Sequence, residues 1–182
     1  MQSFGSQALV DRMVGVSRLD VNTYEEVERD QNATTQAFIV VLLASIAAGI
    51  GTLNSDGVSG LIYGIISGLV GWVVYSVSVY FIGTRFLPTS STEADTGQLL
   101  RTLGFANAPR LLYVFGFIPV LGFIAVAVGG IWSIVTSIIA IRQSLEMSTG
   151  RAIATGLIAL IPYVIITGLI FWIFGISPPG SN

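Results

Sequence analysis

The sequence predicts an all-α fold: a polytopic bundle of about five transmembrane helices, preceded by a short N-terminal amphipathic helix. Of the 182 residues, 53% are hydrophobic and only 10% are charged, with a mean hydropathy of +0.81. A soluble domain averages about 25% charged residues. The charges are also excluded from several long apolar runs, each of the length that crosses a bilayer. Lipid must therefore surround much of this chain.

We expect three parts along the chain: a helical N-terminal region over residues 1–35, a five-span domain over residues 36–176 and a short external tail over residues 177–182. The first part is the only long polar stretch. The last part, rich in Pro, Gly and Ser, is too short to fold by itself.

Two helices are expected in the N-terminal region. Leu9, Val10 and Met13 recur in a helical rhythm among polar residues, which is typical of an amphipathic helix at a membrane surface. A frayed tail is the alternative. Next, Thr23 followed by Glu26 has the spacing of a capping box, so a second helix should begin there.

The first, second and fifth spans follow from uninterrupted apolar runs. They are predicted over residues 37–53, 58–82 and 152–174. A polar turn at residues 54–57 separates the first two. A shorter amphipathic helix should cover residues 98–107.

Residues 111–141 form an uncharged run of awkward length. One helix of this length would measure about 46 Å, against an apolar core of about 30 Å, whereas two full spans need about 40 residues. Pro119 marks the natural break. We therefore expect a short third span ending near Ile118 and a fourth over residues 120–141. The third must borrow part of residues 103–110 or leave the bilayer thinned beside it.

The distribution of arginine supports five crossings. With that topology every basic residue lies on one side of the membrane, whereas reading residues 111–141 as one helix would move two of them across. The positive-inside rule favours the first arrangement, with the N-terminus cytoplasmic and the C-terminus outside, in a cell membrane. The eight residues are Arg12, Arg18, Arg29, Arg85, Arg101, Arg110, Arg142 and Arg151.

Most catalytic chemistry is disfavoured by composition. The chain has no Cys and no His, so no thiol nucleophile, imidazole base or common metal site is expected, and no cofactor. The net charge of −2 gives no indication of nucleic acid as a partner. Apart from Arg110, no ionisable residue lies within the apolar spans, unlike in pumps. Arg110 either contacts a lipid headgroup or a backbone carbonyl, or anchors the chain at the interface, which we favour.

Small residues mark expected helix contacts. Gly60, Gly64 and Gly68 lie four residues apart and form one ridge along the second span. Such ridges let helix backbones approach closely within a membrane. We expect packing within the bundle, and a homodimer seam is the alternative.

The segment from Arg101 to Pro109 resembles the Arg-x-x-Gly-aromatic-Ala-x-x-Pro signature of the Yip (Ypt-interacting protein) family, with Gly104, Phe105 and Ala106 at the inner positions. The resemblance continues through Pro119, through Ile131-Trp132 and through the segments at residues 140–145 and 148–152. It implies a five-span membrane fold. The chain looks like the prokaryotic members, for which the family implies no assigned chemistry.

The resemblance also bears on partners. Eukaryotic members are implicated in vesicle trafficking and in contacts with small Rab GTPases. This chain lacks their longer N-terminal region with its Asp-Leu-Tyr-Gly-Pro-type motif, which argues against small GTPase binding. For the motif residues we expect structural roles. Arg101 can bond a helix-end carbonyl or a phosphate, Gly104 and Ala106 remove bulk, and Pro109 begins a helix without needing an amide donor.

These observations favour a non-enzymatic membrane scaffold or adaptor, as a subunit of a larger complex or a modulator of membrane shape or trafficking. Its partners would be the lipid bilayer and other membrane proteins or further copies of itself. The alternative is an oligomeric permease for a small solute or lipid. An apolar, tightly packed interior would favour the scaffold. A polar-lined cavity would favour the permease, built from Ser67, Tyr75, Ser133, Thr136 and Tyr163.

Overall fold

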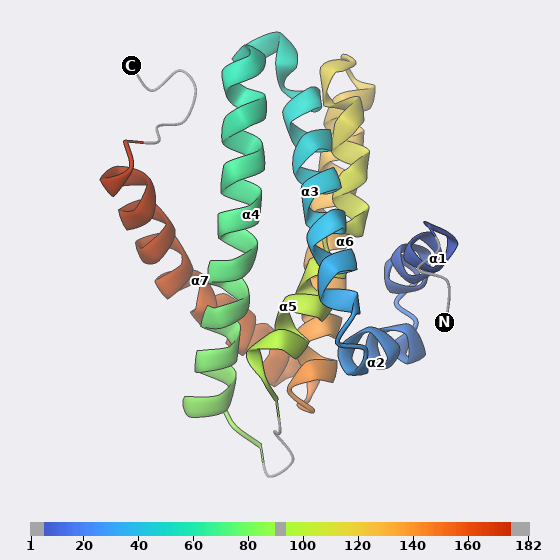
Figure 1. Cartoon of the computed structure of the whole chain (residues 1–182), viewed down its shortest axis with the longest axis vertical. Helices are drawn as coiled ribbons and strands as arrows, with labels where there is room; N and C mark the ends of the chain where they lie inside the picture. Colours follow the sequence, from blue (N-terminus) through green and yellow to red (C-terminus); the bar gives the residue numbers. More distant parts are fainter. Residues whose placement is uncertain (1–5, 90–93, 176–182) are drawn as a thin grey trace.

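A computed structural model describes residues 6–89 and 94–175, and within these ranges all of the regular secondary structure is helical (Figure 1). The predicted all-α bundle with a short N-terminal helix is confirmed. The tail predicted over residues 177–182 lies outside the described residues. The elements are α1 (Ser6–Ser17), α2 (Val21–Arg29), α3 (Ala33–Gly51), α4 (Leu53–Arg85), α5 (Thr96–Phe105), the 3-10 helix η1 (Ala108–Phe117), α6 (Leu121–Ser144) and α7 (Thr149–Ile173).

Four of these helices, α3, α4, α6 and α7, are long and apolar enough to cross a membrane. Their limits agree with the apolar runs because charged and turn-forming residues end each run. The protein is therefore a multi-pass membrane protein whose outer helix faces contact lipid.

The third crossing that the sequence predicts corresponds to two short elements. Figure 1 shows α5 starting near the lower end of the bundle and η1 continuing to the upper end, where α6 begins. A 3-10 helix rises about 2.0 Å per residue and an α-helix about 1.5 Å. The 10 residues of η1 thus reach about 20 Å instead of about 15 Å. This geometry, together with the segment borrowed from α5, explains how so short a stretch reaches the other end.

The bundle has two unlike ends. The polar end comprises α2, the start of α5 and the turn at residues 145–148, and the opposite end comprises the turns at Thr52 and at residues 118–120 (Figure 1). Gly57 interrupts α4 with φ of 60°, a left-handed conformation that glycine adopts without strain. A helical turn therefore precedes the predicted start of the second span.

The predicted capping box at Thr23 is wrong. Helix α2 begins two residues earlier, and Asp20 is its N-cap, accepting from the amide of Asn22 at 3.3 Å. The Thr23 hydroxyl donates to Asp20 Oδ2 at 2.7 Å, so Thr23 lies inside the helix. An aspartate is at least as good an N-cap as threonine. A capping box does form at α5, between Asp95 and Gln98.

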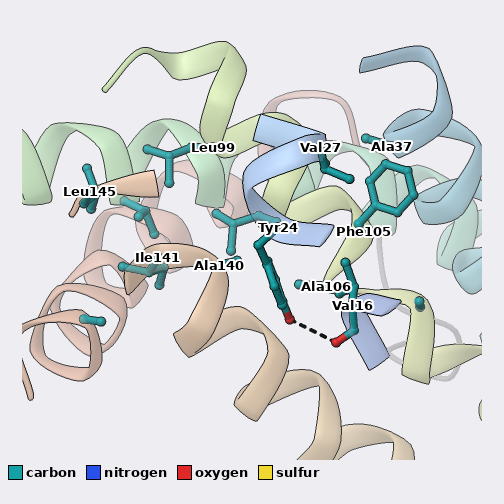
Figure 2. Close-up of a cluster of buried hydrophobic side chains, with 14 of the residues drawn as sticks. Val16, Tyr24, Val27, Ala37, Leu99, Phe105, Ala106, Ala140, Ile141 and Leu145 are labelled. Atoms are coloured by element: carbon teal, nitrogen blue, oxygen red, sulfur yellow. Dashed lines mark hydrogen bonds between the residues drawn. The ribbon is translucent and has the colours of Figure 1, made fainter. Parts of the chain in front are cut away.

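The core is centred on α5 and includes buried residues from all seven α-helices; Figure 2 shows part of it, around α2, α5 and α6. Tyr24 and Phe105 are the largest fully buried side chains there. The Tyr24 hydroxyl lies 3.2 Å from the carbonyl oxygens of Val16 and Thr136, so its polar end is satisfied inside an apolar cluster. Burial raises the pKa of this phenol. The N-terminal helices are thus part of the packed bundle.

The five-crossing topology can be tested with single cysteines, because the chain has none. Ser55 and Ser148 are exposed and lie near opposite ends of the bundle. In intact cells we expect Ser55→Cys to react with an impermeant thiol reagent added outside, and Ser148→Cys to react only after the membrane is opened. Labelling of Ser148→Cys from outside would contradict the topology.

Candidate functional site

Helix α5 is the centre of the motif-bearing region, and it is almost wholly enclosed. Its residues from Arg101 to Phe105 are buried, and it packs against α2, α3, α4 and α6. Trp72 of α4 donates its indole N–H to the carbonyl of Leu100 at 2.9 Å. A helix so surrounded can be displaced only by disturbing several others.

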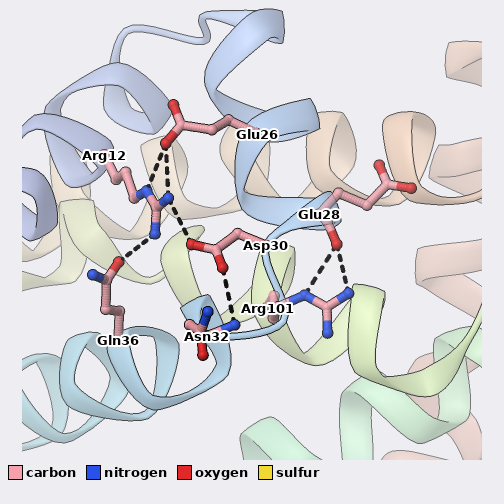
Figure 3. Close-up of polar contacts among 7 residues, drawn as sticks. All are labelled: Arg12, Glu26, Glu28, Asp30, Asn32, Gln36 and Arg101. Atoms are coloured by element: carbon pink, nitrogen blue, oxygen red, sulfur yellow. Dashed lines mark hydrogen bonds and ion pairs between the residues drawn. The ribbon is translucent and has the colours of Figure 1, made fainter. Parts of the chain in front are cut away.

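Arg101 ties α5 to the end of α2. Its side chain is only 6% exposed, and its Nε and Nη2 donate to the carbonyl oxygen of Glu28 at 3.0 and 2.5 Å (Figure 3). This carbonyl is among the last four of α2, which have no partner within their own helix. The guanidinium therefore satisfies a free helix end, one of the two roles expected for it.

Gly104 and Ala106 lie at close helix contacts. A Cβ atom on Gly104 would stand 2.6 Å from Cβ of Ala37 in α3 and 3.2 Å from Nε1 of Trp72. Ala106 is fully buried, and its carbonyl accepts from the Thr136 hydroxyl of α6 at 2.8 Å. Larger side chains at either position would push these helices apart.

Pro109 and Pro119 bracket η1. Pro109 is buried in its first turn, and its carbonyl would lie 2.9 Å from a Cβ on Gly129 of α6. Pro119 is exposed in the turn before α6, and the whole of η1 separates it from α5. The structure thus gathers the motif from Arg101 to Pro109 into one region and leaves Pro119 at the opposite end.

The glycine ridge of α4 faces α3 in part. A Cβ on Gly64 would make ordinary contacts with Ser45 and Gly49, at 3.7 and 3.8 Å, while a Cβ on Gly68 would overlap Ser45. Gly60 is buried against the side chain of Asp56 in its own helix. At Gly64 and Gly68 the ridge therefore lies against a neighbouring span within the same chain.

Arg12 connects the first three helices (Figure 3). It donates to Glu26 of α2 at 2.7 Å, to Asp30 after α2 at 2.8 Å and to Gln36 of α3 at 2.7 Å. Burial alone would lower the pKa of this guanidinium, but its carboxylate partners raise it overall. These contacts fix α1 and α2 against the bundle.

A polar cleft of about 560 Å³ lies between α2 and the turn that joins α6 to α7. Acidic and basic residues both line it. Burial raises the pKa of Glu28, and the nearby charge of Glu146 adds to this effect. Its charged lining residues are Glu25, Glu28, Arg29, Arg142 and Glu146.

A larger cavity, of about 710 Å³, lies among the helices that cross the bundle. Every crossing helix contributes to its walls. Four of the five residues expected for a polar cavity line it, namely Ser67, Tyr75, Ser133 and Tyr163. The fifth, Thr136, instead bonds to the Ala106 carbonyl.

Arg110 also lines this cavity. The cavity's α4 residues run from Gly64 to Tyr75, around the middle of that helix, so the cavity lies near mid-bundle. Its Nη1 donates to Asn107 Oδ1 at 3.0 Å, and its Cζ stands 5.3 Å from the centre of the Tyr113 ring. Both contacts orient the cation without neutralising it.

Sequence reasoning missed several residues that position this region. Asn107 holds Arg110, Ser144 pairs with Thr102 at 2.8 Å, and Tyr24 joins α2 to α6. A buried tyrosine or hydroxyl pair leaves no periodic signal. The Asp95 cap could have been found, because Gln98 follows it at the capping-box spacing.

Together, the apolar crossing helices, their lipid-facing surfaces and the polar end define an integral, multi-pass membrane protein of the α-helical class. The sequence matches the family model described as the Yip1 domain over residues 20–175. The chain therefore belongs to the Yip1 family, as the resemblance implied. No curated protein and no solved structure matches the sequence.

The close contact between Gly104 of α5 and helix α3 can be tested directly by substitution. Gly104→Ala should destabilise the bundle by about 1–3 kcal/mol, the usual cost of overpacking, because the new methyl group overlaps Ala37. The measurement is the thermal unfolding midpoint in detergent. Gly150→Ala is the matched control, since nothing lies within 4 Å of the added atom. Equal midpoints for the two variants would contradict the close contact.

The second motif residue can be tested by a conservative change. Arg101→Lys keeps the charge but loses the two-pronged contact with Glu28, so we expect α2 to loosen, with a loss of about 1.5–3 kcal/mol. Hydrogen exchange of the α2 amides in detergent measures this effect. Arg29→Lys, at an exposed pair with Glu25, is the control and should change stability by less than about 1 kcal/mol. Unchanged α2 protection in Arg101→Lys would refute the role.

Proposed function

We propose that this Yip1-family protein is a non-enzymatic membrane scaffold that holds another membrane protein through its polar end, with its N-terminus cytoplasmic and its C-terminus outside. The carrying observation is the one-sided gathering of charged side chains. α1, α2, the start of α5 and the turn between α6 and α7 carry most of them. The opposite end carries only Asp56 among its turns.

The polar cleft is the part of this end best suited to a protein partner. It is open, and it presents both signs of charge on rigid elements, which favours a complementary polar surface over a single ion. Side chains at its rim are accessible, with Arg29 78% and Glu25 44% exposed. Charges at such a rim govern partner choice more than affinity.

The opposite end supports the same proposal by contrast. The chain turns there within a few residues, at Thr52 and at residues 118–120. Such short turns leave little surface for a folded partner. A scaffold needs one broad face, whereas a channel needs an entrance at each end.

The test is a charge swap at the rim of the cleft. The double variant Glu25→Arg with Arg29→Glu keeps the ion pair within α2, at 3.1 Å in the native chain, but reverses the charge pattern shown to a partner. We expect the folded protein to lose most of its co-purifying membrane protein in mild detergent. Asp56→Asn, at the opposite end, should retain it. A partner retained equally by both variants would contradict this docking face.

The mid-bundle cavity favours a second candidate, an oligomeric permease for a small solute or lipid. The two functions differ in reconstituted vesicles. For the scaffold we expect no uptake of common solutes above that of empty vesicles. Saturable uptake by the native chain would replace the scaffold with the permease.

A further inference from the structure

The mid-bundle cavity contains a cation that has no counter-ion in the described part of the chain. Arg110 has five N–H donors, and its one hydrogen-bond partner there is the neutral side chain of Asn107. None of the residues that line the cavity is acidic. The sequence itself has no Asp or Glu between Asp56 and Glu93, or between Asp95 and Glu146.

An unpaired charge in a cavity among membrane-spanning helices costs free energy. Charged side chains inside a membrane normally pair with one another or face water, because lipid cannot solvate them. The helix segments that line this cavity contain no Asp or Glu that could pair with Arg110. The guanidinium is therefore set up to be neutralised by an anion from outside the chain, and a planar guanidinium matches phosphate in a two-pronged contact.

A second unsatisfied polar group lies beside the cavity. Ser133 Oγ of α6 is buried and has no hydrogen-bond partner in the described structure. Both Ser133 and Arg110 line the same space, as does Ser137 one turn further along α6. A buried hydroxyl without a partner costs about 1–3 kcal/mol. A ligand that accepts hydrogen bonds would remove that cost.

The cavity opens sideways, toward lipid. Ile134 of α6 and Leu157 of α7 line it, and they are 63% and 61% exposed on two membrane-spanning helices. Its mouth is thus apolar and faces the bilayer, while its polar groups lie deeper. In Figure 1, α7 leans away from the rest of the bundle toward its C-terminal end.

We propose that this cavity binds an anionic phospholipid, whose phosphate contacts Arg110 and accepts from the Ser133 hydroxyl once that hydroxyl turns toward it, and whose acyl chains leave between α6 and α7. The volume of about 710 Å³ lies within the range of about 300–1,000 Å³ for ligand sites, enough for a headgroup and the start of its chains. The site rests on the cavity alone. It holds whether the protein acts as a scaffold or as a permease.

The experiment measures lipid retention by the whole protein purified in detergent. Native mass spectrometry would be used to titrate phosphatidylglycerol, phosphatidylcholine and inorganic phosphate separately. We expect one phosphatidylglycerol per chain, bound more tightly than phosphatidylcholine. Arg110→Gln should weaken its binding by about tenfold or more, the size of one charge-assisted hydrogen bond. Arg85→Gln, an exposed arginine outside the cavity, is the control.

Ser133→Ala is the second variant, chosen because it removes a hydroxyl that has no hydrogen-bond partner and should therefore leave the fold intact. It should bind phosphatidylglycerol several-fold more weakly, with no loss of thermal stability in lipid-free detergent. Equal phosphatidylglycerol binding by the native chain, Arg110→Gln and Ser133→Ala would overturn the proposal. So would inorganic phosphate that displaces the lipid at equal concentration, since the ligand would then be a soluble anion.

Discussion

The closest helix contact in the motif region occurs where α5 meets α3, and much of the bundle depends on it. At Gly104 there is no room for a Cβ atom between Ala37 and Trp72. In lipid, apolar surfaces gain little by meeting each other, so close packing and hydrogen bonds must hold helices together. With α5 seated this closely, Arg101 reaches the end of α2 and Ala106 reaches Thr136.

The small residues that allow close helix packing also help to create the cavity. Small residues on α3 and α4 bring those backbones together, but on the side facing α6 and α7 they leave space that no large side chain fills. Arg110 and the serines around it border that space. The small residues of α3 and α4 thus account for both the close packing and the internal cavity. The polar end remains the broad surface that we propose for other proteins.

The long spans could be predicted from sequence because each is bounded by charges and turn residues that lipid excludes. The resemblance also led to Arg101 and Gly104, although their partners, Glu28 and Ala37, lie far away in sequence. The start of α2 could not be decided, since Asp20 and Thr23 both make good caps and only packing selects between them. The shape of the cavity could not be predicted, because residues from six helices line it and their relative positions depend on the packing of the whole bundle.

The position of η1 has a consequence for how the chain is made. This helix is short, and a 3-10 helix has weaker hydrogen bonds, so it is not stable by itself. It packs between α3 and α6, with Gly116 standing against Gly51. During synthesis α3 exists before η1, but α6 follows it. Helix η1 therefore reaches its final form only after α6 has been added, so entry into the membrane and completion of the fold are separate events for this chain.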